Sequence, residues 1–63
     1  MFNVVIEMPS GALSQEHIFQ NETEADMLFR RFVSQMRPWK GFHADVVLTD
    51  DGKVIQLEQI RNA

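Results

Sequence analysis

Few residues of this chain are of types that could do chemistry, and their spacing matches no catalytic or metal-binding motif. His17 and His43 could bind a metal ion together with Asp45 and Glu58 if the strands that carry them were neighbours. Their spacing has no HExxH-like signature, however. Asp45 and Glu58 are also an acid pair of the kind that glycosidases use, but a chain of 63 residues offers no cleft to desolvate one carboxyl. We therefore expect no enzyme activity, no metal and no cofactor.

Glycine-rich phosphate-binding loops and a GxSxG nucleophile turn are also absent. The three glycines are Gly11, Gly41 and Gly52, and a turn or a loop explains each of them.

Charge is distributed unevenly along the chain. Residues 1–29 hold five acids and no Lys or Arg, whereas residues 30–40 hold four cations and no acid. One interpretation is that these charges complement a helix dipole, with Asp26 and Arg30 as an i,i+4 pair. The other is that a basic and aromatic patch lies where the helix ends and binds phosphate or an acidic protein surface. This candidate patch consists of Arg30, Arg31, Arg37, Trp39, Lys40 and Phe42.

Nucleic acid is the weaker of these two targets, because nine acids outnumber six basic residues. Trp and Arg are common anchors of protein interfaces, and a short loop carries Trp39 and Phe42. The alternative for these two aromatic residues is that they cap the open end of the core.

One helix and four strands must position these residues. Apolar residues at helical spacing, from Ala25 to Met36, predict a helix that Asn21 or Thr23 caps and Pro38 ends. Alternation of apolar and polar residues predicts strands over residues 2–8, about 13–20, 43–49 and about 53–60.

Turn residues join the strands into hairpins. Pro9, Ser10 and Gly11 suit a type I turn, and Asp51-Gly52 is a strong two-residue hairpin signal. The register of the first hairpin stays open: one pairing sends His17 and Phe19 inward, and a one-residue slip sends Ile18 inward. For the second hairpin we expect Asp50 opposite Lys53, Leu48 opposite Ile55, Val46 opposite Leu57 and Asp45 opposite Glu58.

The predicted fold is therefore a single α+β domain over residues 1–63. It has the order ββαββ and a four-stranded, mostly antiparallel sheet with one helix packed on one face. The strand order is 2-1-3-4 or, with a right-handed crossover, 1-2-3-4. The opposite sheet face should be mostly polar in a monomer, yet it would carry several apolar side chains. These are Val5, Val47, Val54 and Ile60, with Ile18 in one register.

A domain of this size buries a thin core and often needs a disulfide, a metal or a partner subunit, and the chain has no cysteine. We expect self-association through the outer sheet face or an edge strand. The N-terminal residues have neither the early positive charge of a signal peptide nor the length of a membrane span, so we expect a cytoplasmic protein without a membrane partner.

The small acidic ββαββ outline is similar to accessory proteins of phages and mobile elements that act by binding a host macromolecule. Our functional hypothesis is a non-enzymatic protein-interaction module, such as a regulator or inhibitor. The alternatives are a nucleic-acid-binding domain that uses the basic end of the helix and a homodimeric accessory protein.

Overall fold

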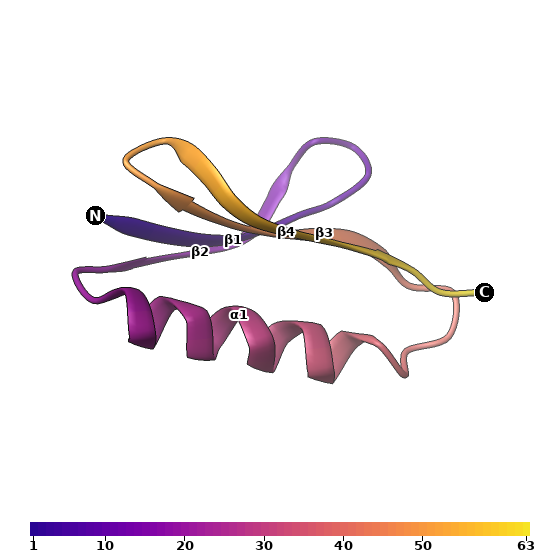
Figure 1. The fold of residues 1–63 in the computed structure, drawn as a ribbon. Helices are drawn as coiled ribbons and strands as arrows, with labels where there is room; N and C mark the ends of the chain where they lie inside the picture. The colour runs from indigo at the N-terminus through magenta and orange to yellow at the C-terminus, as the bar shows by residue number, and fades with distance from the viewer.

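Four strands form one antiparallel sheet, and a single helix lies across one of its faces (Figure 1). The computed structural model describes all 63 residues. The elements are β1 (Phe2–Glu7), β2 (Leu13–Phe19), α1 (Glu22–Met36), β3 (His43–Asp50) and β4 (Lys53–Arg61). The predicted ββαββ fold is confirmed, and the strand order is β2-β1-β3-β4. Of the two predicted orders, 1-2-3-4 is wrong, because α1 returns the chain to the free side of β1.

The core lies between α1 and the two central strands. Its helix residues share one stripe at the spacing of a 3.6-residue turn, and the strand residues alternate along β1 and β3. The ten buried residues are Val4, Ile6, Ala25, Phe29, Phe32, Met36, Ala44, Val46, Leu48 and Ile60. Because the one helix packs on one face, the opposite face of the sheet has no layer of its own chain over it.

Helix α1 begins and ends where the sequence predicts. Asn21 is the N-cap: its Oδ1 accepts hydrogen bonds from the backbone N–H of Thr23 at 2.7 Å and of Glu24 at 3.2 Å. Thr23, the alternative cap, is inside the helix. At the other end Arg37 is the C-cap, and Pro38 cannot supply the N–H that another turn would need.

The first hairpin adopts the register that turns His17 and Phe19 toward the helix side. Val4 pairs with His17 and Phe2 with Phe19, so Ile18 lies on the outer face. Near the turn, Ile6 pairs with Gln15 but Glu7 pairs with Leu13, which leaves an irregularity in β2. The predicted turn is present, with the Gly11 N–H donating to the Met8 carbonyl at 2.8 Å.

The second hairpin also contains a bulge, and the bulge changes its register. Asp50 pairs with Lys53, as expected, across a turn in which Asp51 has φ 49° and Gly52 φ 85°. Beyond that point the expected pairs are wrong, because one extra residue in β4 reverses which side chains face the helix. The observed pairs are Leu48 with Gln56, Val47 with Leu57, Val46 with Glu58 and Asp45 with Gln59.

This reversal corrects one residue of the predicted outer face. Ile60 is 1% exposed and belongs to the core, whereas Leu57, which we expected inside, is 53% exposed on the outer face. The physical reason is that β4 lies over the flank of α1, where polar side chains find partners. The Gln56 Nε2 donates to Asp26 Oδ1 at 2.6 Å, and Glu58 meets Arg37.

Both hairpin turns bend away from the helix. In Figure 1 the β1–β2 turn and the β3–β4 turn rise on the side of the sheet opposite α1. Helix α1 is too short and too polar to cross a membrane.

Candidate functional site

A row of apolar side chains crosses the outer face of the sheet. Val5 on β1 pairs with Val47 on β3, and Val47 pairs with Leu57 on β4. Because side chains alternate along a strand and Val4, Val46 and Leu48 face the core, Val5 and Val47 must face away from the helix. The row therefore spans three adjacent strands.

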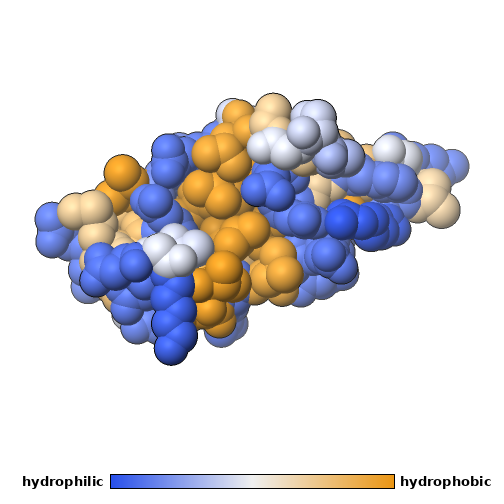
Figure 2. Space-filling model, turned by 90° about the horizontal axis from the view of Figure 1, so that it is seen from above, coloured by the Kyte–Doolittle hydropathy of each residue, from blue (hydrophilic) through white to orange (hydrophobic).

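Further apolar residues extend this row. Ile18 on β2 is 58% exposed and Val54 on β4 is 55% exposed, and Ile55 lies at the bulge. Figure 2, which looks onto the face opposite the helix, shows an apolar band in orange across this face. We call Val5, Ile18, Val47, Val54, Ile55 and Leu57 the outer-face patch.

Charged residues of the outer face lie around the patch and are mostly engaged. Asp45 forms an ion pair with Arg61 at 2.9 Å. Glu16, which pairs with Val5 across β1 and β2, accepts a hydrogen bond from Asn3 Nδ2 at 3.2 Å. The centre of the patch, at Val5 and Val47, carries no charge.

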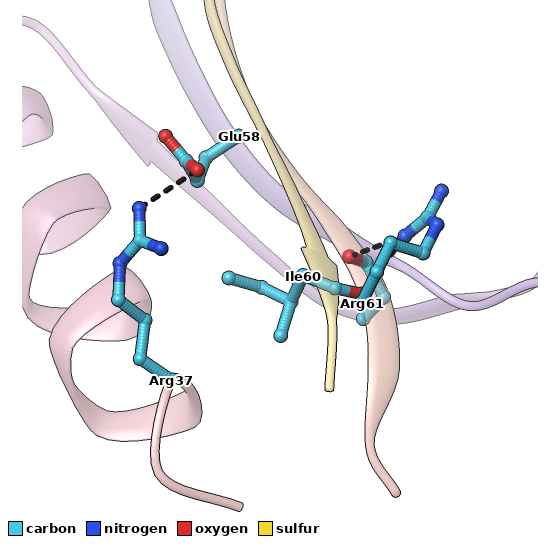
Figure 3. A network of polar contacts seen from close by, with 5 residues as sticks. Arg37, Glu58, Ile60 and Arg61 are labelled. Carbon is cyan, nitrogen blue, oxygen red and sulfur yellow. Dashed lines mark hydrogen bonds and ion pairs between the residues drawn. The ribbon is translucent and has the colours of Figure 1, made fainter. Parts of the chain in front are cut away.

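The predicted basic and aromatic patch does not form one surface. Arg30 pairs with Asp26 at 2.9 Å, and Arg37 pairs with Glu58 on β4 at 2.7 Å (Figure 3). Both guanidinium groups therefore lie on the flank of α1 that faces β4 and are held by carboxylates.

Arg31 and Lys40 behave differently from those two arginines. Each is exposed, and neither has a carboxylate at ion-pair distance. Arg31 follows Arg30 by 100° around the helix, so it points away from the flank that faces β4. Of the four predicted cations, these two are available to a partner.

Trp39 and Phe42 lie at the open end of the core, as one of the two interpretations expects. Phe42 packs partly buried against the core, and Trp39 contacts it edge to face, with ring centroids 5.1 Å apart. The Trp39 side chain nevertheless remains 50% exposed.

These two aromatic residues border a small apolar groove between the end of α1 and the β1–β2 hairpin. Its volume is about 170 Å³, and we call it the end groove. Its lining residues are Ile6, Met8, Ser14, Gln15, Phe32, Gln35, Met36, Trp39 and Phe42.

The residues first considered for chemistry are kept apart. Strand β1 lies between β2, which carries His17, and β3, which carries His43. Asp45 and Glu58 point to opposite faces of the sheet, with Arg61 and Arg37 as their respective partners. No group of three His, Cys, Asp or Glu side chains is close enough to hold a metal ion.

Asn62 is a structural residue that the sequence did not reveal. Its Nδ2 donates to the carbonyls of Met36 at 2.8 Å and Trp39 at 2.7 Å, and its N–H donates to the Phe42 carbonyl. Asn62 thus fixes the loop that presents Trp39. An Asn after a strand carries no periodic signal that could have predicted this long-range cap.

Comparison with known proteins identifies no relative: no family model, curated protein or solved structure matches this chain. The two apolar surfaces, the outer-face patch and the end groove, are therefore the candidate functional sites of this chain.

Proposed function

We propose that this chain is a non-enzymatic protein-interaction module that works as a homodimer, with the outer-face patches of two copies packed against each other. The observation that carries this proposal is the uncharged row Val5–Val47–Leu57 across three adjacent strands. An apolar patch of this extent, surrounded by polar residues, is typical of an interaction surface.

The layout of the sheet favours a second copy as the occupant. The centre of the sheet lies between β1 and β3, where Val5 pairs with Val47. A two-fold axis parallel to the strands at this point places β1 over β3 of the other copy and β2 over β4. Val5 of each copy then meets Val47 of the other, as an isologous interface requires.

The position of Glu16 favours this axis over the perpendicular one. An axis along the row Glu16–Val5–Val47–Leu57 would bring the two copies of Glu16 together, and like charges in contact are unfavourable. With the axis parallel to the strands, Glu16 instead lies over Leu57 of the other copy. The same axis places Glu7 over Asp45 of the other copy, where Arg61 of that copy compensates the Asp45 charge.

The area of the face is sufficient for a specific but modest interface. Four strands about 4.8 Å apart and about seven residues long cover roughly 19 by 23 Å. Two such faces together exclude roughly 900 Å² before the relief of the side chains is counted, close to the roughly 1,000 Å² of a specific interface. The dimer interface would therefore be at the small end of specific interfaces. It would also give the thin core of ten buried residues a second layer.

The six basic residues of the chain do not favour the nucleic-acid alternative. Arg30, Arg37 and Arg61 are held by carboxylates, which leaves Arg31, Lys40 and Lys53 without a partner. Lys53 lies at the β3–β4 turn, on a different element from the other two. A cytoplasmic location and a regulatory role toward a host macromolecule stay predictions.

Sedimentation over a concentration series tests the dimer. Val47→Lys should weaken self-association about 100-fold or more, because a lysine would be buried at the axis in both copies. Met27→Lys is the matched control, since Met27 is an exposed apolar residue on the helix, and it should change nothing. A wild-type protein that stays monomeric at millimolar concentration would overturn the proposal. Dimers that survive Val47→Lys with an intact circular-dichroism spectrum would instead indicate pairing through an edge strand.

Opposite charges at Leu57 test the axis. With the axis parallel to the strands, Leu57→Lys places an ammonium near Glu16 of the other copy, whereas Leu57→Glu places a second carboxylate there. We expect Leu57→Glu to weaken the dimer at least about tenfold more than Leu57→Lys. Equal losses would contradict this axis.

A further inference from the structure

The end groove is a separate surface, because it opens at the helix side of the sheet and shares no residue with the outer-face patch. We propose that it binds one large apolar side chain of an acidic protein segment. This inference goes beyond self-association and does not depend on it.

The size of the groove suits a single side chain. Its volume is about 170 Å³. An engineered protein cavity of about 150 Å³ takes up benzene, so a groove of this size can hold the side chain of a Leu, Met or Phe.

The lining of the groove suits an apolar anchor. Phe32, Met36 and Ile6 are buried core residues that form its floor, and Trp39 stands beside it with half of its surface exposed. A half-exposed Trp on a supported loop gains much apolar contact when a partner covers it, and Trp residues often dominate binding energy. Met8 and Met36 add flexible side chains that can adapt to the shape of the anchor.

The loop that carries Trp39 is held in place before any partner binds. Asn62 Nδ2 donates to the Trp39 carbonyl at 2.7 Å, and the Gly41 N–H donates to the Ala63 carbonyl at 3.1 Å. A preorganised loop loses little entropy on binding.

Polar groups around the groove indicate what surrounds the anchor. Ser14, Gln15 and Gln35 line it with neutral hydrogen-bonding groups, which suit the backbone of an extended segment. Arg31 precedes Gln35 by one helical turn, and Lys40 follows Trp39 in the chain. Because neither cation has an acid partner in the chain, Asp or Glu residues beside the apolar anchor would be complementary to them.

Selection from a library of displayed random peptides tests this inference on the wild-type protein. We expect the selected peptides to share one Leu, Met, Phe or Ile flanked by Asp or Glu. Trp39 is the only tryptophan, so its fluorescence should shift to shorter wavelength when such a peptide covers it. Selected peptides without an apolar anchor, a selection that enriches basic peptides, or no enrichment at all would overturn the proposal.

Variants separate the two parts of the site. Trp39→Ala should weaken binding of a selected peptide at least tenfold, or about 1.4 kcal/mol. The double change Arg31→Glu with Lys40→Glu should weaken it and reverse its salt dependence, because attraction becomes repulsion. Lys53→Glu is the matched control for an unpartnered cation at the other end of the sheet, and it should leave affinity unchanged.

Two further measurements test the groove and the identity of its ligand. Gln35→Trp should block the groove while leaving Trp39 in place, which covers the case in which Trp39→Ala does not fold. Unchanged peptide affinity in folded Gln35→Trp would overturn the proposal. A single-stranded oligonucleotide that quenches Trp39 fluorescence and binds more tightly than the selected peptides would indicate that the ligand is nucleic acid and not an acidic segment.

Discussion

Asn62, the residue after β4, donates a hydrogen bond from Nδ2 to the carbonyl of Met36, the last residue of α1, at 2.8 Å. The same nitrogen donates to the Trp39 carbonyl, so one side chain adds a second donor to two carbonyls that already accept the backbone N–H of Trp39 and of Phe42. The sheet edge and the end of the helix are thereby joined by a side chain that is distant from both carbonyls in the sequence.

We expect Asn62→Ala to lower the free energy of unfolding by about 1–2 kcal/mol, because it removes two side-chain hydrogen bonds that join β4 to the end of α1, while the Trp39 and Phe42 N–H groups still donate to these carbonyls. Urea denaturation measures this loss. Gln20→Ala, at an exposed position after β2, is the control and should stay within about 0.5 kcal/mol of wild type. An equal stability of the two variants would show that water replaces the Asn62 amide at no cost.

The parts of this fold that could be predicted from the sequence are those with a local signal. The Asn21 cap, the stop at Pro38 and the Asp51-Gly52 turn each depend on neighbouring residues, and all three are present. The Asn62 cap and the pairing of Arg37 with Glu58 join residues far apart in the chain, and periodicity carries no information about such contacts.

The bulge in β4 explains why the outer face was only partly predicted. Strand β4 has two competing sets of apolar residues at alternate positions, with Ile55 and Leu57 in one set and Ile60 in the other. Alternation alone places Ile55 and Leu57 on the helix side. The choice depends on polar partners in the helix, because Asp26 and Arg37 attract Gln56 and Glu58 to the inner side. The sequence pattern of β4 taken alone could not include these partners.

Truncation of the two competing residues tests this account of the bulge. Ile60→Ala should lower the free energy of unfolding by about 2–4 kcal/mol, because Ile60 is fully enclosed in the core. Leu57→Ala should cost less than about 1 kcal/mol. Both are measured by urea denaturation in the Val47→Lys background, so that loss of dimer contacts does not contribute. A larger cost for Leu57→Ala would contradict the register described above.

The N-terminal amine gives stability a defined dependence on pH. A hydrogen bond to Asp51, with Oδ1 at 3.0 Å, raises the pKa of the Met1 ammonium, and the charge of Asp50 adds to the effect. A cation whose pKa is raised by folding stabilises the protein below its unfolded pKa of about 8, and this contribution is lost as pH rises through the folded value. Stability should therefore fall as pH rises above about 8.

Asp51→Asn should remove much of this fall while keeping the turn, because Asn-Gly is also a favoured two-residue hairpin sequence. Thermal denaturation from neutral pH to the alkaline side measures it, and Asp26→Asn serves as a carboxylate control away from the amine. A fall of the same size in Asp51→Asn would assign the pH dependence to other groups.

The two proposed surfaces make a joint prediction about geometry. A two-fold axis parallel to the strands keeps each end groove at its own height along the strands, so both grooves of a dimer lie at the same end. The two sheets should be about 10 Å apart, and each groove lies on the helix side of its own sheet, so the grooves are roughly 20 Å apart.

Two copies of a selected peptide joined by a flexible linker of about 15 residues should reach both grooves. The joined peptide should bind at least about 100-fold more tightly than a single one. Val47→Lys should abolish this gain while leaving the affinity of the single peptide unchanged, as measured by Trp39 fluorescence. A gain that persists in Val47→Lys would contradict the dimer geometry but not the end groove. Loss of single-peptide binding in Val47→Lys would instead show that the end groove depends on the dimer.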